Sequence, residues 1–219
     1  MASEIEICNL ALGNIRAGSI NSFTEGSIQA QQCNLKYSII RDRCLREIVW
    51  SFNRKIEALA TLSSVTIFNW AYAYQYPSDC LKIRRLIDTH EETSTDSTGN
   101  ISRTRNLDEL PLRHERAQIP YEVFNVSNNK VIGANQDQLR IEYAAKVEDP
   151  NLFSDDFILA MSHLLGAELA IPIVGAEIGR ALRRDSLQMY QSYMNDAISD
   201  DMNEQYHEPL ESDFVTIRN

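Results

Sequence analysis

The sequence predicts an α+β protein in which N- and C-terminal helices form a helical bundle. A small antiparallel β-sheet domain is inserted between them, and the C-terminal tail is extended. Three observations predict this fold: apolar residues recur at helical spacing at both ends of the chain, aromatic residues alternate near its middle, and the last residues are mostly polar. With 219 residues, 43% of them hydrophobic, the chain is long enough to bury a core.

Residues 1–52 predict an N-terminal helical hairpin. Ser3 and Glu6 have the spacing of a capping box, which favours a helix that begins at this point. A second amphipathic helix is expected over residues 25–50, after a loop that contains glycine and serine. We expect each helix to bury one apolar stripe. The stripe of the first is Ile5, Cys8, Leu12 and Ile15, and that of the second is Ile28, Cys33, Tyr37, Ile40, Cys44 and Ile48.

Residues 53–147 predict a β-rich insertion, because short alternating runs are separated by turn residues. Four aromatic residues alternate along one of these runs, so we expect them on one face of a strand, in the core or in a subunit interface. Base stacking is the alternative, but nucleic-acid platforms surround their aromatics with cations, and residues 69–79 contain none. The four aromatics are Trp70, Tyr72, Tyr74 and Tyr76.

Residues 148–205 predict C-terminal helices that pack on the N-terminal ones. Ser154 is a candidate N-cap for the first of them. One uninterrupted helix over residues 155–199 would be about 68 Å long, which is too long for a domain of this size. We therefore expect a bend between Pro172 and Gly175. The final segment, 206–219, predicts an extended tail that fills a strand position or docks on a partner.

The net charge of −10 is concentrated in the C-terminal third of the chain. Residues 148–213 hold 14 acidic and 3 basic residues, so the remainder is close to neutral. This distribution argues against an ordinary nucleic-acid-binding surface, which needs lysine and arginine to contact phosphates. It fits either a solvated helix face or a surface that repels DNA. The longest uncharged apolar run, 169–176, is shorter than the roughly 20 residues of a membrane span, so we expect no membrane association.

The residues that carry chemistry form no recognisable catalytic, cofactor or metal motif, and we expect a protein that is not an enzyme. Asp155 and Asp156 are best explained as negative charge in the first turn of a helix, with a divalent-cation site as the alternative. His163 is expected to be structural. The other histidines are His90, His114 and His207, and none is spaced to share a metal with another. The four distant cysteines, Cys8, Cys33, Cys44 and Cys80, are expected to be small buried hydrophobes.

Several short motifs occur in an order that resembles the tail tubular protein A family, the head-to-tail adaptors of short-tailed bacteriophages. The resemblance covers roughly the first 85 residues and returns weakly in the C-terminal helices. The motifs are Cys8-Asn-Leu-Ala-Leu-Gly-Asn-Ile, Cys33-Asn-x-x-Tyr37-x-x-x-Arg41-Asp-x-x-Leu45, Trp50-Ser-Phe52-Asn-Arg54-Lys55, Tyr72-Ala-Tyr-Gln-Tyr-Pro77-Ser-Asp79-Cys80-Leu and the ending Asp213-Phe214-x-x-x-Arg218. Phe214 stands where the family usually has a tryptophan.

The resemblance implies a virion protein, made in the host cytoplasm, that forms a ring of twelve copies between the portal protein and the tail nozzle. The ring would continue the DNA channel without binding DNA sequence-specifically, and no cofactor is implied. Two alternatives remain open: another phage head or tail completion factor, and a non-catalytic adaptor or regulatory domain. On the connector interpretation we expect acidic residues to face the channel and the tail to dock on a neighbouring ring. The channel candidates are Asp196, Asp200 and Asp201, and those of the tail are Phe214, Val215, Ile217 and Arg218.

Overall fold

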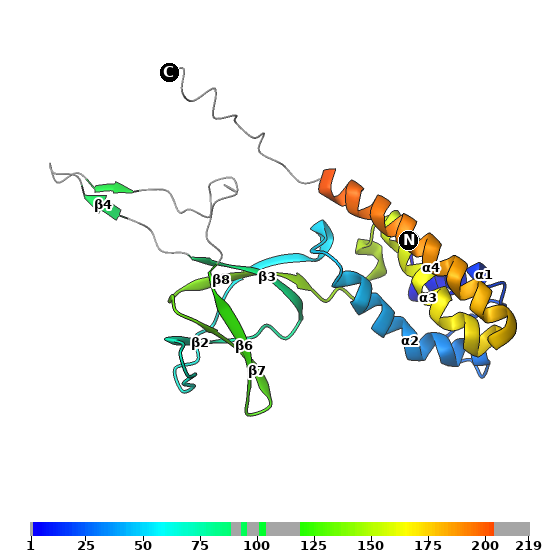
Figure 1. The fold of residues 1–219 in the computed structure, drawn as a ribbon, viewed down its shortest axis with the longest axis horizontal. Helices are drawn as coiled ribbons and strands as arrows, with labels where there is room; N and C mark the ends of the chain where they lie inside the picture. The colour runs from blue at the N-terminus through cyan, green and yellow to red at the C-terminus, as the bar shows by residue number, and fades with distance from the viewer. Residues whose placement is uncertain (1, 89–92, 96–100, 104–118, 204–219) are drawn as a thin grey trace, which may run out of the picture. The chain divides into compact units, whose positions relative to one another are not determined.

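The computed structural model describes residues 2–88, 93–95, 101–103 and 119–203. The fold is α+β, with four α-helices and two small three-stranded sheets among the described residues. It divides into a helical unit, built from residues up to Arg54 and again from Ala144 onward, and a β unit between Lys55 and Tyr143 (Figure 1). The predicted tail, 206–219, lies outside the described residues.

The first helix, α1 (Glu4–Asn14), has the predicted capping box. The Ser3 hydroxyl accepts a hydrogen bond from the Glu6 backbone N–H at 3.1 Å, and the Glu6 carboxylate accepts one from the Ser3 N–H at 2.7 Å. Two of the amide groups that a helix start leaves without partners are thereby satisfied. Cys8, Leu12 and Ile15 are buried as predicted, whereas Ile5 is only half-buried.

The second helix, α2 (Ile28–Leu45), is shorter than predicted at both ends. Ser27 caps its start by accepting a hydrogen bond from the Ala30 N–H. Beyond its end, the Trp50 indole N–H donates to the carbonyl of Cys44 at 3.2 Å, and the Asn53 amide donates to that of Leu45 at 3.1 Å. These side chains replace the next helical turn, so the chain can leave the helix without burying unpaired carbonyls.

The third and fourth helices, α3 (Asp155–Val174) and α4 (Ala176–Asn203), are separated within the predicted bend. The break is at Gly175, whose φ of +93° and ψ of 165° suit glycine almost alone. Pro172 lies inside the last turn of α3 rather than at the break. Ser154 caps α3 as predicted, accepting a hydrogen bond from the Phe157 N–H.

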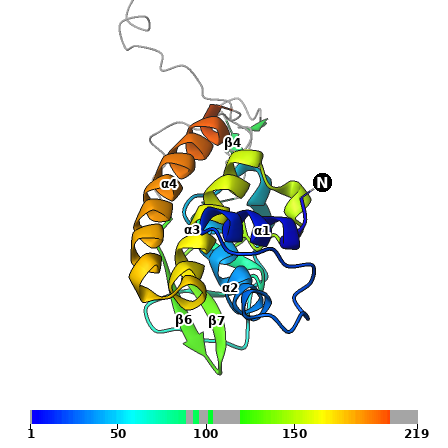
Figure 2. The same ribbon diagram turned by 90° about the vertical axis from the view of Figure 1, so that its right-hand side faces the viewer.

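The core of the helical unit is built around α3, which packs against α1, α2 and α4. Figure 2 shows α4 along the left margin of this unit, with α3 beside it. The length and mean hydropathy of α3 (1.9) would also suit a membrane span, but 61% of that stretch is buried inside the protein, as in the central helix of a folded domain. Four aromatic rings close one end of the core, with neighbouring centroids 5.0–5.8 Å apart: Trp50, Phe52, Phe153 and Phe157.

Pro172 leaves one backbone carbonyl of α3 without its helical hydrogen-bond donor, and a side chain of another helix supplies the donor. Proline has no N–H, so the carbonyl of Glu168, four residues earlier, loses its helical donor. The Lys36 ammonium of α2 donates to this carbonyl at 2.5 Å, while Arg183 of α4 pairs with the Glu168 carboxylate at 2.9 Å. Glu168 therefore connects α3 to both α2 and α4.

We predict that Lys36→Met lowers the free energy of unfolding by about 1–3 kcal/mol, because it leaves a partly buried carbonyl without a donor. The double variant Lys36→Met/Pro172→Ala should recover much of this loss, since an alanine in place of the proline restores the helical N–H. Urea unfolding of the two variants and of Pro172→Ala alone measures the coupling. If Lys36→Met and Lys36→Met/Pro172→Ala lost the same free energy of unfolding, this role for the ammonium would be contradicted.

The β unit contains two three-stranded sheets. One has the order β1 (Arg54–Ala58), β8 (Leu139–Ala145), β3 (Cys80–Asp88), and the other has the order β2 (Tyr72–Gln75), β7 (Asn129–Ala134), β6 (Tyr121–Val126). In the second sheet β7 is antiparallel to both neighbours, with Ile132 opposite Tyr74 and Val123. A separate two-stranded ladder joins β4 (Thr93–Thr95) to β5 (Ile101–Arg103).

Candidate interaction surfaces

The aromatic run of the β unit contributes mainly to packing, and its residues do not all share one face. Tyr72 and Tyr74 lie on the same face of β2, with ring centroids 6.4 Å apart. Tyr74 is fully buried, and its hydroxyl donates to the carbonyl of Gln136 at 2.6 Å. The Tyr76 ring is half-buried beneath the Lys130 ammonium, which lies 5.0 Å from its centroid. This cation comes from β7, so its position could not be read from the local sequence.

Trp70 departs from the predicted alternation. It precedes β2, and its indole packs so closely on Gly133 that an added Cβ there would lie 2.8 Å from Trp70 Cγ. It belongs to a cluster with Ala73 and Val131, on the sheet face opposite Tyr74. The reason is the tight turn before the strand, in which Asn69 has a φ of +68°. The same turn leaves the neighbouring Phe68 side chain 87% exposed, a feature that the alternation did not predict.

A hollow of about 490 Å³ in the β unit is bordered by an ion pair. Lys55 and Asp79 are 2.5 Å apart at its rim, and Tyr143 donates a hydrogen bond to the same carboxylate at 2.9 Å. Burial opposes ionisation of this carboxyl, but the hydrogen bonds from Lys55 and Tyr143 hold the pKa of Asp79 below its usual range. These contacts indicate that Asp79 has a structural role.

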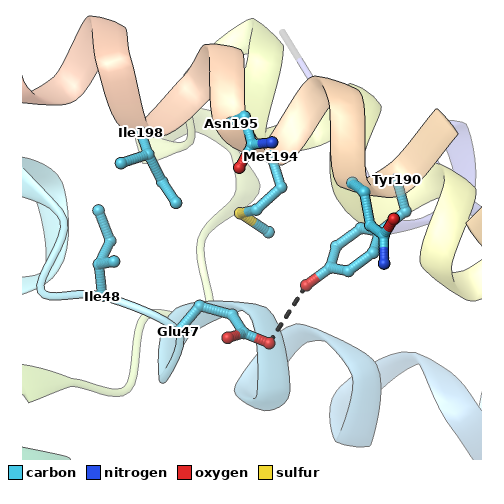
Figure 3. A pocket seen from close by; sticks show the side chains of 7 residues that line it. Glu47, Ile48, Tyr190, Met194, Asn195 and Ile198 are labelled. Carbon is cyan, nitrogen blue, oxygen red and sulfur yellow. Dashed lines mark hydrogen bonds between the residues drawn. The ribbon is translucent and has the colours of Figure 1, made fainter. Parts of the chain in front are cut away.

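A groove of about 410 Å³ in the helical unit lies between the end of α2 and one side of α4 (Figure 3). Glu47 and Ile48 form one wall of the groove. From the opposite wall, the Tyr190 hydroxyl donates a hydrogen bond to the Glu47 carboxylate at 3.2 Å. Burial, the largest cause, raises the pKa of Tyr190, so this phenol remains a donor at neutral pH. The α4 wall consists of Tyr190, Gln191, Met194, Asn195 and Ile198.

Acidic side chains gather where α3 begins and α4 ends. Asp156 feels the negative charges of Asp200, Asp155 and Asp196. Burial, followed by the negative charge of Asp200, raises the pKa of Asp156. The structure thus brings together the Asp155–Asp156 pair and two of the three predicted channel-facing residues.

Asp201 does not belong to that exposed group. Its side chain is buried, 7% exposed, and its carboxylate accepts a hydrogen bond from the Ser51 backbone N–H at 2.7 Å. Helical rotation explains the difference, because consecutive residues lie about 100° apart and Asp201 turns toward the core while Asp200 remains exposed. In the isolated chain, Asp201 is therefore a structural residue and the prediction of a channel-facing carboxylate is wrong for it.

The outer side of α2 carries an exposed aliphatic stripe. Ile28, Leu35 and Ile39 are 62%, 63% and 65% exposed, whereas Cys33, Tyr37, Ile40 and Cys44 on the inner side are buried as predicted. The prediction was therefore wrong for Ile28. Its exposure has a simple geometric cause, since positions 28, 35 and 39 lie within about 40° of one another around the helix, opposite the core-facing side. The spacing of these three residues was a signal available in the sequence.

Cys8 and Cys33 face each other across α1 and α2, although they are far apart in the sequence. Both thiols are fully buried, and the hydrogen bond with Cys33, followed by burial, raises the pKa of Cys8. Protonated thiols of this kind act as small apolar groups. All four cysteines are free and buried, as expected.

His163 stacks on Tyr193, with ring centroids 5.2 Å apart and 12° between the ring planes, and so joins α3 to α4. Burial lowers the pKa of His163. The structural role expected for this histidine agrees with the stacking. The remaining histidines lie outside the described residues, and among the described ones no cluster of three or more histidine, cysteine or acidic side chains could hold a metal ion.

We predict that acidification destabilises the α3–α4 contact through His163. Because its pKa is lower in the folded protein, the unfolded chain takes up the proton first, and the free energy of unfolding falls as the pH drops below about 6.5. His163→Phe keeps an aromatic ring on Tyr193 and should flatten this part of the profile. Urea unfolding between about pH 7 and pH 5 measures both slopes, and identical slopes would contradict the prediction.

No protein-family model matches the chain, and no curated protein matches it.

Proposed function

We propose that this chain is a structural virion protein, the subunit of a ring-shaped head-to-tail connector. Twelve copies would join the portal protein to the tail nozzle and continue the channel through which DNA leaves the head. The ordered resemblance of its motifs to the tail tubular protein A family supports this proposal. The α+β architecture agrees with the fold that the resemblance implies.

The structural observation that best supports an assembly role is the aliphatic stripe of α2. Three large side chains on one helix are each more than 60% exposed in the single chain. Scattered apolar residues are normal on protein surfaces, but an aligned row of this kind marks a surface that another protein covers. A ring subunit needs such surfaces, because each copy must offer two different patches that match between neighbours.

The acidic group at the start of α3 and the end of α4 gives the proposed ring a surface for the DNA channel. Asp155 and Asp200 are exposed there, and the half-buried Asp156 feels the negative charge of both. Like charge would prevent phosphates from adhering to the channel wall. We include the tail, 206–219, as the segment that docks on an adjoining ring, since an extended peptide can order on contact with its partner.

We predict that Asp200→Lys slows DNA ejection while the ring still assembles, because every copy then presents a cation to passing phosphates. Glu177→Lys is the matched control, since it makes the same change in charge at an exposed position near the start of α4. Ejection from purified particles can be followed by dye binding to the released DNA. Ejection as fast as in the control variant would contradict the channel position of Asp200.

The connector proposal is tested by removing the chain from the phage whose genome encodes it. Particles without the connector should accumulate as filled heads that lack tails, and adding the purified protein should restore tail attachment. Complete, infectious particles assembled in its absence would overturn the proposal. A different completion factor would also leave defective particles, but its loss would not remove a ring from the portal.

A further inference from the structure

The aliphatic stripe of α2 continues into a positive charge. Ile28 and Ile39 are eleven residues apart, and Arg46 follows seven residues later, exposed at the C-cap of the helix. Steps of eleven and seven residues return to nearly the same side of a helix, so Ile28, Leu35, Ile39 and Arg46 form one face. We call it the α2 outer face.

A face of α4 repeats this spacing with the opposite charge. Ile178 and Met189, 61% and 42% exposed, are also eleven residues apart, and the exposed Asp196 again follows after seven. Leu182 lies between them on the same side, half-buried. We call Ile178, Leu182, Met189 and Asp196 the α4 side face. The exposed Asp185, seven residues after Ile178, also lies on this side. Both faces therefore have two apolar residues eleven positions apart, followed after seven by a charged residue.

The two faces match when the helices lie side by side and parallel. Ile28 then lies beside Ile178, Ile39 beside Met189, and Arg46 beside Asp196. The eighteen steps from Ile28 to Arg46 give a contact about 27 Å long. Apolar side chains cover Ile28 and Ile39, Leu35 falls between Leu182 and Asp185, and the charges at the end are opposite in sign. Electrostatic pairing of this kind fixes the register and direction of two helices more than it adds affinity.

The faces cannot meet within one copy. The end of α2 approaches α4 at the groove, where the α4 wall is formed by Tyr190, Met194 and Ile198. Met194 and Ile198 lie on the side of α4 roughly opposite Met189 and Asp196, by the rotation of about 100° per residue. The α4 side face is thus directed away from α2 of the same chain, and its match must come from a second copy.

We propose that the α2 outer face of one copy packs in parallel against the α4 side face of the next. The contact is heterologous, so repetition closes a ring or extends a filament. This proposal rests on the proposed function, because it identifies the contact as the lateral one between neighbouring subunits of the connector ring. It also assigns Asp196 to this contact, so that Asp155, Asp156 and Asp200 remain for the channel. A symmetric contact between two α2 helices is less suitable, because it leaves the α4 side face uncovered.

The contact is tested with two single variants of the full-length chain, Ile39→Asp and Met189→Asp. Each should weaken self-association at least about tenfold, because each places a charge in the apolar part of the contact. Met202→Asp is the matched control, an exposed methionine of α4 outside the side face. Native mass spectrometry gives the species present, and circular dichroism checks that the variants are folded.

Mixing the two variants separates a heterologous contact from a symmetric one. Ile39→Asp keeps an intact α4 side face, and Met189→Asp keeps an intact α2 outer face, so the mixture should form a one-to-one dimer that grows no further. Self-association that is lost with Ile39→Asp but unchanged with Met189→Asp would overturn the proposal in favour of a symmetric α2 contact. Arg46→Glu and Asp196→Arg should each weaken association, and their combination in one chain should restore it.

Cross-linking can detect the contact even if the copies associate too weakly for native mass spectrometry. In the full-length chain, Ile39→Cys with Met189→Cys should give a ladder of linked copies with a short bis-maleimide, whereas Ile39→Cys with Met202→Cys should not. The proposed contact is overturned if the wild-type chain stays monomeric and the Ile39→Cys/Met189→Cys variant gives no ladder, either alone or in the presence of the portal protein. If a ring forms on the portal but tolerates Ile39→Asp and Met189→Asp, only the lateral contact fails. If the contact holds but no portal ring forms, the connector function fails.

Discussion

Removing both arginines that face Glu142 should destabilise the β unit more than any other change described here. The Glu142 carboxylate of β8 is fully buried and contacts Arg84 at 3.2 Å and Arg85 at 2.5 Å, both from the neighbouring strand β3. Arg84→Met/Arg85→Met leaves the buried carboxylate without these cations. The expected loss in the free energy of unfolding is about 3–5 kcal/mol, because a buried charge that loses its cationic partners is far more costly than a lost surface pair.

The triple variant Arg84→Met/Arg85→Met/Glu142→Met is the decisive comparison. It removes the buried charge together with its partners, so it should recover most of the stability that the double variant loses. Lys55→Met serves as the control for an exposed pair, and its loss should stay below about 1 kcal/mol. Urea unfolding of the three variants gives these values. A triple variant no more stable than the double would show that packing of the arginine stems, and not charge pairing, determines the loss.

A single methyl group at Gly179 should weaken the α3–α4 hairpin. A Cβ at this position would lie 2.8 Å from the Ala170 carbonyl oxygen and 3.0 Å from Ile171 Cα, and both are backbone atoms that cannot rotate away. Alanine favours a helix over glycine by about 1 kcal/mol, yet forcing the two helices apart should outweigh this gain. We expect Gly179→Ala to lower the free energy of unfolding by about 1–3 kcal/mol.

Gly13→Ala is the matched control, because no atom lies within 4 Å of the added Cβ at that position of α1. It should be neutral or stabilising by up to about 1 kcal/mol, as the gain in helix propensity meets no steric cost. In a protein of this size, each kcal/mol shifts the Tm by roughly 2–4 °C. Thermal unfolding followed by circular dichroism compares the two variants. Changes of the same sign at both glycines would contradict the close helix crossing.

The features that the sequence predicted well are those set by neighbouring residues. The Ser3 capping box, the Ser154 cap and the break near Gly175 each depend on a few consecutive residues with defined backbone requirements. Local rules suffice for such elements because the energies involved do not depend on the rest of the fold.

The features that the sequence did not predict depend on contacts between distant residues. The Cys8–Cys33 contact and the pairing of Glu142 with Arg84 and Arg85 join elements whose mutual position no local pattern specifies. Asp201 was assigned by composition alone, and only its rotation on α4 shows that it points inward.

Ile28 illustrates a different limit. An apolar residue at helical spacing looks the same whether it faces the core of its own chain or a second chain, so the pattern alone placed it in the core. Its 62% exposure, shared by Leu35 and Ile39, is what identifies the outer face of α2 as a surface for assembly. The proposed interface therefore needed the fold before it could be recognised.

The most direct test of the connector proposal is electron microscopy of the purified protein mixed with the portal protein encoded in the same genome. We expect a ring of twelve copies added to one end of the portal, coaxial with its channel. Intact portals that carry no added ring, at protein concentrations where the chain is folded and in excess, would contradict the proposal.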